Sequence, residues 1–404
     1  HDTNRDFFML NQKESKLINR VMSQEWFPQV HLDEHQMGSR GPRMFVPPYE
    51  DPMSPNLSPL LLRLEALYGT NMSFRLEENG KTGVIDSWAF DSYWPGGTRT
   101  AAWKNIISLL TELASCNIAS PIYIEKNELS GGRKGMVDYQ RQINFPHPWT
   151  GGWWRLSDII DYELIASYAF LETSAKFRES ILRGFYSMNL QAINAGKNQP
   201  PFAYVIPTNQ YDDITAAKLV EILIEHGIQI YRSNEDLIID NRIYPANSLI
   251  IPLAQPLRSF IKEMLDIQHF PEVRLTESSD PLYPYDVTAW SLPLLMNVRC
   301  DRIDQKFSID MTQISNAPYP AGNVNGTSQY GYAIPHKYNN TSIAINRLLK
   351  IKNNIYAATK NFQDGKQHFE TGTILIPAGK TNFDQLEKIA QQLHIPVYAL
   401  SQPL

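Results

Sequence analysis

Short motifs in the first 115 residues carry side chains that can do chemistry together. Asn4 and Arg5 stand side by side in Asp-Thr-Asn-Arg-Asp-Phe and offer an amide next to a planar guanidinium. A guanidinium can hold a carboxylate through two parallel hydrogen bonds. The pair is therefore a candidate carboxylate-binding site, and an ordinary surface salt bridge is the alternative.

A histidine follows a stretch with the alternation of a β-strand. His35 lies in Asp-Glu-His-Gln, directly after residues 28–33. A neutral imidazole at a strand end can bind zinc through one nitrogen while a carboxylate or carbonyl orients the other. A hydrogen-bonded histidine without a metal is the alternative. His31 lies on the same side of any regular strand, so alternation does not separate the two histidines.

A carboxylate interrupts the apolar run at residues 109–114, and an aromatic turn precedes it. Glu112 in this run is predicted to be buried and suited to proton transfer, with a structural ion pair as the alternative. Tyr93 belongs to the turn Tyr-Trp-Pro-Gly-Gly and can present a phenol over a site. A turn that is simply rich in aromatic residues is the alternative there.

Periodicity predicts the elements that must position these residues. Helical spacing of apolar residues predicts helices, and alternation or apolar runs predict strands. In the first half we expect helices at 10–22, 57–68, 98–108 and, as one or two long helices, 157–195, and strands at 28–33 and 109–114. Residues 38–59 are rich in Gly and Pro and are predicted to be loop.

Asn198 to Pro201 forms the clearest boundary, because strand and helix patterns alternate after it. The expected elements are 203–206, 214–226, 228–231, 248–251, 256–267, 373–376, 383–393 and 397–400. Such alternation is typical of a parallel sheet with helices on both faces, so we predict a flavodoxin-like or Rossmann-like domain. The predicted organisation is 1–130, a loop-rich and long-helix connector at 131–199, and 200–404.

Composition excludes several classes of protein. The net charge of -5 gives no electrostatic footprint for nucleic acid, and the apolar runs are too short to cross a membrane. The two cysteines, Cys116 and Cys300, make neither a disulfide framework nor a cysteine metal site. Because the chain starts without Met or a signal peptide, we expect a fragment or a processed product. The oligomeric state is not predicted.

Taken in order, the motifs resemble those of M14 zinc metallocarboxypeptidases. Asn-Arg-Asp-Phe resembles the substrate-binding signature of that family, Asp-Glu-His-Gln its third zinc ligand, and Leu-Thr-Glu-Leu its catalytic-glutamate strand. The resemblance covers residues 1–130 and implies the C-terminal part of an α/β/α catalytic domain with a mixed sheet.

The resemblance also implies roles and partners. Zn²⁺ would be bound by His35, Glu112 would transfer protons, and Tyr93 would close over the substrate. Asn4 and Arg5 would bind the terminal carboxylate of a peptide or protein substrate. The enzyme would be periplasmic or secreted. The family's upstream His-x-x-Glu, which supplies two further zinc ligands, is absent before Asn4, so we expect this chain alone to be inactive.

Residues 200–404 resemble class I glutamine amidotransferase-like domains around residues 332–335 and 346–349. Cys300 lacks the flanking glycines that a nucleophile elbow requires, which favours a structural or binding module. Two alternatives stay open for the whole chain. One is a non-catalytic peptide- or glycan-binding protein, and the other is a nucleotide- or glutamine-using enzyme, for which no Gly-rich phosphate loop is present.

Overall fold

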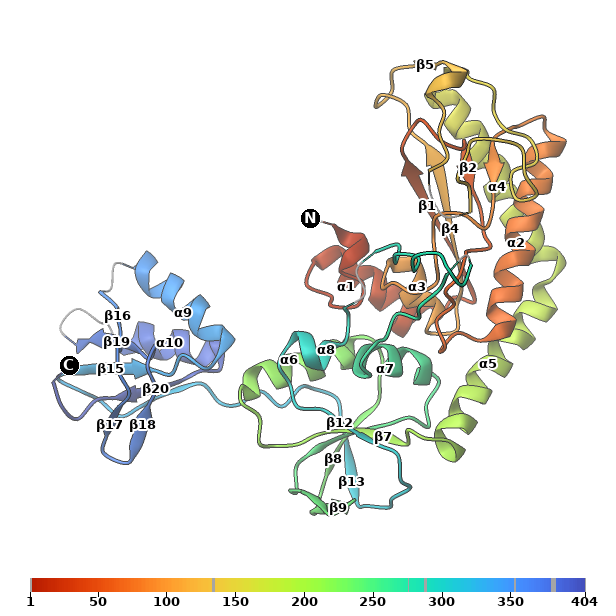
Figure 1. The fold of residues 1–404 in the computed structure, drawn as a ribbon. Coiled ribbons are helices and arrows are strands. Elements are labelled where there is room, and N and C mark those ends of the chain that lie inside the picture. Colours follow the sequence, from red (N-terminus) through yellow and green to blue (C-terminus); the bar gives the residue numbers. More distant parts are fainter. Residues whose placement is uncertain are drawn as a thin grey trace. The chain divides into compact units, whose positions relative to one another are not determined.

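The structure is a computed structural model that describes residues 2–132, 135–274, 276–286, 289–351, 354–378 and 383–403. Over these residues the protein is mixed α/β (Figure 1). Its contacts group into two units, His1–Phe202 with Pro252–Ser291 and Ala203–Ile251 with Leu292–Leu404. The break at 202/203 lies near the expected boundary at 199/200. Residues 252–291, expected in the second domain, belong to the first unit.

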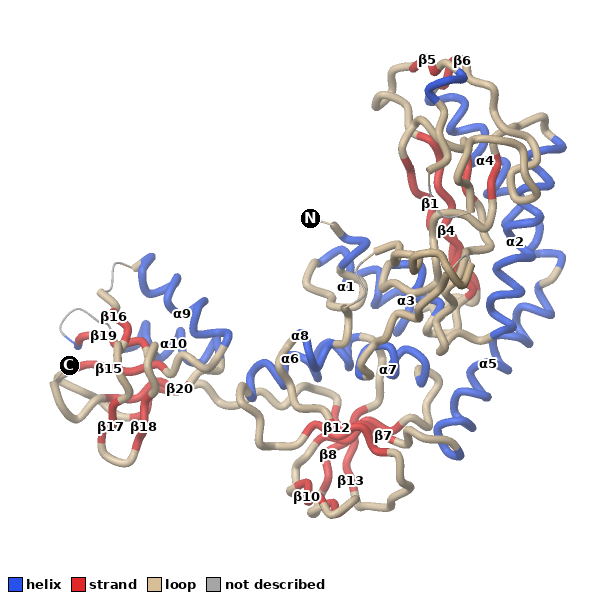
Figure 2. The backbone as a smooth tube through the Cα atoms, viewed as in Figure 1, coloured by secondary structure: helices blue, strands red, loops and turns tan. Residues whose placement is uncertain are grey.

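The first unit combines one four-stranded sheet with a small two-stranded sheet and several helices. Much of the chain at 38–58 and 115–151 is loop (Figure 2). The strands are β1 (Val30–Met37), β2 (Met44–Phe45), β3 (Val84–Ile85), β4 (Ile107–Ala114), β5 (Ile122–Ile124) and β6 (Gly152–Trp154). The helices are α1 (Lys13–Arg20), α2 (Pro59–Glu78), α3 (Gly97–Ala102), α4 (Leu156–Lys176), α5 (Arg178–Asn198) and α7 (Arg258–Leu265), with short turns η1 (Thr3–Arg5), η2 (Val21–Glu25) and η3 (Lys126–Glu128).

The four-stranded sheet has the order β1-β4-β2-β3, and β1 runs parallel to β4. Because successive side chains point to opposite faces, each strand divides its residues between two environments. Val30, Leu32 and Leu109 belong to an apolar core shared with α2 and α4. The opposite face of the same two strands carries the polar residues discussed below.

Two helices differ in length from the prediction. The helix expected at 57–68 continues as α2 to Glu78, because Gly69 lets it pass the backbone of Pro47. A Cβ at Gly69 would lie 1.7 Å from the carbonyl oxygen of Pro47. The helix expected at 98–108 ends as α3 at Ala102, since Asn105 has a φ of 64° in the left-handed region.

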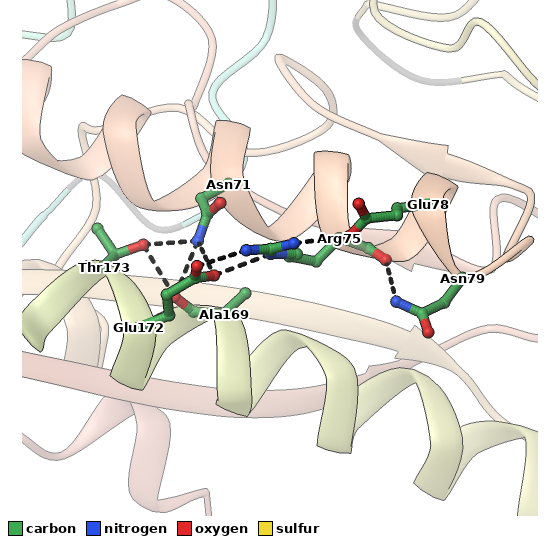
Figure 3. Close-up of polar contacts among 7 residues, drawn as sticks. All are labelled: Asn71, Arg75, Glu78, Asn79, Ala169, Glu172 and Thr173. Atoms are coloured by element: carbon green, nitrogen blue, oxygen red, sulfur yellow. Dashed lines mark hydrogen bonds and ion pairs between the residues drawn. The ribbon is translucent and has the colours of Figure 1, made fainter. Parts of the chain in front are cut away.

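The helices of the predicted connector pack against the first unit. Helix α4 lies along α2, and polar contacts join the two (Figure 3). Asn71 donates to the carbonyl oxygen of Ala169 at 3.1 Å and to Thr173 Oγ1 at 2.9 Å. Arg75 Nε donates to Glu172 Oε2 at 2.8 Å. The long-helix segment is thus part of the unit that carries the candidate site.

A buried carboxylate fastens residues 252–291 to the same unit. Glu263 on α7 is fully buried and accepts hydrogen bonds from Ser54 at 2.6 Å, Asn56 at 2.8 Å and Trp290 at 3.3 Å. Burial raises the pKa of Glu263, and these donors act in the opposite direction. Three donors satisfy an acceptor that would otherwise be costly to bury.

The second unit contains two five-stranded sheets, ordered β12-β7-β11-β8-β13 and β14-β20-β15-β19-β16, and two hairpins, β9–β10 and β17–β18. The strands are β7 (Ala203–Ile206), β8 (Ile230–Ser233), β9 (Leu237–Ile239), β10 (Arg242–Tyr244), β11 (Leu249–Pro252), β12 (Asp301–Ile303), β13 (Met311–Ile314), β14 (Asn323–Asn325), β15 (Gly331–Ile334), β16 (Tyr356–Ala357), β17 (Phe362–Asp364), β18 (Gln367–Phe369), β19 (Ile374–Pro377) and β20 (Pro396–Ala399). The helices are α6 (Asp213–Glu225), α8 (Leu292–Leu295), α9 (Asn339–Lys350) and α10 (Phe383–Leu393).

These sheets differ from the single parallel sheet that the alternation predicts. The pairs β11–β8, β12–β7 and β13–β8 are antiparallel, as are β15–β19 and β15–β20. The reason is visible between β8 and β11, where the chain makes the β9–β10 hairpin. A parallel pair needs a long crossover, usually a helix, and none lies between these two strands.

Candidate active site

His35 and Glu112 are direct register partners on the parallel strands β1 and β4. Partners in register point to the same face of a sheet, so the two side chains lie on the polar face. Glu112 is buried, with 7% of its surface exposed. The charge of the Glu112 carboxylate is one of the causes that raise the pKa of His35.

Asp33 holds the imidazole. His35 Nε2 lies 3.1 Å from Asp33 Oδ1, and Thr98 Oγ1 at the start of α3 donates to Asp33 Oδ2 at 2.9 Å. The bond to Asp33 raises the pKa of His35 above its ordinary value, against the effect of burial. For Asp33, burial acts to raise the pKa, but the hydrogen bond and charge of His35, the charge of His31 and the hydrogen bond from Thr98 together lower the pKa.

His31 has a different environment. Its Nδ1 lies 2.8 Å from Ser108 Oγ, its register partner on β4. Burial lowers the pKa of His31, and the nearby charge of Asp33 raises it less. The structure therefore separates the two histidines that alternation alone leaves equivalent: His31 bonds to a hydroxyl, and His35 to a carboxylate.

Asn4 and Arg5 reach the same region from the short turn η1. Asn4 Oδ1 accepts a hydrogen bond of 2.8 Å from the backbone N–H of Gly97, the first residue of α3. The guanidinium of Arg5 lies 5.0 Å from the ring centre of Trp94 and forms an ion pair with Asp286. The positive charge of Arg5 acts to lower the pKa of His35, so the two groups are within electrostatic reach. We call Asn4, Arg5, Asp33, His35 and Glu112 the polar cluster.

Tyr93 points to a different set of partners. Its hydroxyl donates to the carbonyl oxygen of His269 at 2.7 Å, and its ring makes edge contacts with Phe270 and Trp290. Only 3% of its surface is exposed. The residue of this turn that meets the polar cluster is Trp94. Gly96 makes room for it, since a Cβ there would lie 1.8 Å from the Trp94 indole.

Three residues of this region were not predicted from the sequence. Asp33 was recoverable, because it lies two residues before His35 on one strand and so faces the same side. Trp94 was quoted only as part of a turn, and its stacking on Arg5 needed the path of η1. The pairing of Asp286 with Arg5 could not be predicted, because the two residues are far apart in the sequence and Asp286 belongs to no recognisable motif.

The described residues do not supply a complete zinc site. Among them, no group of three or more His, Cys, Asp or Glu side chains could hold a metal ion. His35 Nε2 lies 3.1 Å from Asp33 Oδ1. Catalytic zinc sites use about three protein ligands.

Cys300 immediately precedes the strand β12. A nucleophile elbow places its residue between a strand and a following helix, which is not the arrangement here. The two segments quoted for the amidotransferase resemblance lie on β15 with Pro335 after it and inside α9.

No helix within the described ranges combines the length and the apolar character needed to cross a membrane. Comparisons with protein-family models, with curated proteins and with solved structures found no match for this chain.

Proposed function

We propose that this chain carries the substrate side of a carboxypeptidase-type site. In this proposal Arg5 and Asn4 bind the free carboxylate at the end of a peptide, and Glu112 transfers protons during hydrolysis of the last peptide bond. The observation that carries the proposal is that three separate motifs meet in one polar cluster. Asn4 on η1 accepts from Gly97 at the start of α3, the neighbouring Thr98 donates to Asp33 on β1, and His35 on β1 is the register partner of Glu112 on β4.

Each residue has a chemical task in the proposal. The Arg5 side chain is 33% exposed, and its planar guanidinium can bind a carboxylate through two parallel hydrogen bonds. Glu112 accepts a proton from the attacking water and returns it to the leaving amine. His35, held by Asp33, adds positive charge to a site that binds anions.

Zinc-dependent hydrolysis is the activity that the resemblance to M14 enzymes implies. Any zinc ligands beyond His35 would have to come from outside the described residues. Asp33 would orient the imidazole through Nε2, and His35 would bind the metal through its other ring nitrogen.

A second candidate is recognition of peptide C-termini without hydrolysis, which needs only a carboxylate-binding group such as Arg5 beside Trp94 and no metal. One assay separates the two candidates. Peptides with a free C-terminal carboxylate are incubated with the protein, with and without added Zn²⁺, and released amino acids are measured together with binding by calorimetry. Release that disappears in Glu112→Gln supports hydrolysis. Binding without release, lost in Arg5→Gln, supports recognition alone. Neither binding nor release contradicts both.

A further inference from the structure

Arg5, which binds the ligand carboxylate in the proposed function, already pairs with a carboxylate side chain of this protein. Asp286 forms an ion pair with Arg5, and the two side chains are 16% and 33% exposed. Both residues belong to the first unit, although they lie far apart in sequence. Under the proposed function, the side chain of Asp286 takes the place of the ligand carboxylate.

The residue before Asp286 is fixed on the same aromatic surface. The backbone N–H of Tyr285 donates to Asp91 Oδ2 at 3.1 Å. The ring of Tyr285 lies 4.6 Å from Phe90 and 5.2 Å from Trp94, measured between ring centres. Trp94 is also the ring that lies against Arg5. One indole thus contacts both the guanidinium and the aromatic ring of this segment.

A cavity borders this aromatic surface. It has a volume of about 190 Å³ and is lined by Phe90, Trp88 and Met37, among other residues. Met37 follows His35 by two residues on β1 and so points to the same face of the sheet. An apolar or aromatic group therefore has room next to Phe90, the ring on which Tyr285 packs.

We infer that Tyr285 and Asp286 are an internal ligand of the polar cluster, and that the external ligand that displaces them is a carboxylate with an aromatic side chain beside it. The inference rests on the proposed function, because it uses Arg5 as the carboxylate-binding group. Aromatic contact and charge pairing are the two interactions that the internal segment makes there. A ligand must replace both the aromatic contact and the charge pair. Only molecules in which Tyr285 and Asp286 have left the polar cluster can bind the ligand, so the apparent affinity is lowered accordingly.

The test compares Asp286→Asn with Asp280→Asn, which removes the same charge from an exposed position of the same segment. Calorimetry measures binding of acetyl-Gly-Phe with a free carboxylate, its amide, and acetyl-Gly-Ala with a free carboxylate. We expect Asp286→Asn to bind the Phe acid about fivefold or more tightly than Asp280→Asn does, with the amide and the Ala acid weaker. Equal affinities in the two variants, or weaker binding in Asp286→Asn, would overturn the inference.

Hydrogen exchange at the backbone amides of Leu282, Tyr283, Tyr285 and Asp286 separates this inference from the proposed function. We expect faster exchange in Asp286→Asn than in Asp280→Asn, because the segment loses its charged partner. If hydrogen exchange is the same in the two variants and the acids still bind tightly, only the role of Tyr285 and Asp286 as an internal ligand is overturned. Faster exchange with no binding of any acid overturns the carboxylate-binding role of Arg5, and the inferred ligand class fails with it.

Discussion

Two arginine–carboxylate pairs of the first unit use the same groups in different surroundings. Arg99 on α3 pairs with Glu65 on α2 at 2.6 Å, and both side chains are 1% exposed. Arg99 also donates to the carbonyl oxygen of Ser108 at 2.8 Å and lies 4.2 Å from the ring centre of Tyr49. This pair is sealed between two helices and a strand.

The pair of Arg5 and Asp286 also has an aromatic ring, Trp94, but it is only partly buried. Removing one partner of a sealed pair leaves an uncompensated buried charge, which is strongly unfavourable. A partly exposed charge can exchange its partner for water or another anion at little cost. We therefore expect Arg99 to stabilise the fold and Arg5 to be available for binding a ligand.

The largest expected effect is at the sealed pair. Glu65→Gln should lower the free energy of unfolding of the first unit by about 3–5 kcal/mol, because Arg99 would stay buried without its counter-charge. Denaturant unfolding measures this. The control is Glu78→Gln on the same helix, whose side chain is 50% exposed and whose removal should change stability by about 0.5 kcal/mol or less. Similar losses in the two variants would contradict the assignment of Arg99 to stability.

A smaller effect is expected where the backbone makes room for Trp94. Gly96→Ala places a methyl group against the indole and should cost about 1–3 kcal/mol. It should also weaken the binding of carboxylate peptides, because Trp94 supports Arg5. Gly38→Ala is the control, since a Cβ there meets no atom within 4 Å. Equal thermal stability of both variants would show that Trp94 does not need this space.

At the exposed pair, loss of the charge should hardly affect stability. Asp286→Asn should change the free energy of unfolding by about 1 kcal/mol or less, as is usual for partly exposed ion pairs. The measurement is the same denaturant series as for Glu65→Gln. A loss as large as at Glu65 would mean that Arg5 and Asp286 are a structural pair.

The smallest effect depends on pH. The raised pKa of His35 means that its contribution to stability is fully present below its ordinary value of 6.5 and is lost as the pH rises through its folded-state pKa. The lowered pKa of Asp33 means that its contribution is lost only as the pH falls below its ordinary value of 3.8.

The stability difference between the wild type and His35→Gln should therefore be larger at about pH 5.5 than at about pH 9, by about 1 kcal/mol or less. Unfolding measured at both pH values checks this, and NMR titration of the His35 ring gives its pKa directly. A His35 pKa below the ordinary value would contradict the Asp33 contact.

Local patterns in the sequence predicted much of the first unit. The strands predicted at 28–33 and 109–114 correspond to β1 and β4, and the helix predicted at 57–68 corresponds to the first half of α2. Strand β1 continues to Met37, so His35 lies within the strand and not after its end as predicted. The end of α3 was missed, because it depends on the left-handed backbone at Asn105. Strand direction in the second unit was missed too, since alternation does not report whether a hairpin or a helix joins two strands.

The candidate site was predicted only where a motif is local. Asn4, Arg5, His35 and Glu112 could be named from short strings, and the structure brings them to one region. The contact of Arg5 with Asp286 joins distant parts of the chain and depends on how residues 252–291 return to the first unit. No local sequence pattern predicts that residues 252–291 pack with the first unit.

The most direct test of the central claim is NMR of the arginine side chains during titration with a peptide that has a free C-terminal carboxylate. Arg99 serves as an internal reference, because its guanidinium is sealed against Glu65. We predict that the Arg5 resonances shift with the free acid and not with the amidated peptide, and that the Arg99 resonances stay in place. Arg5 resonances that do not respond, or that respond equally to acid and amide, would contradict the account.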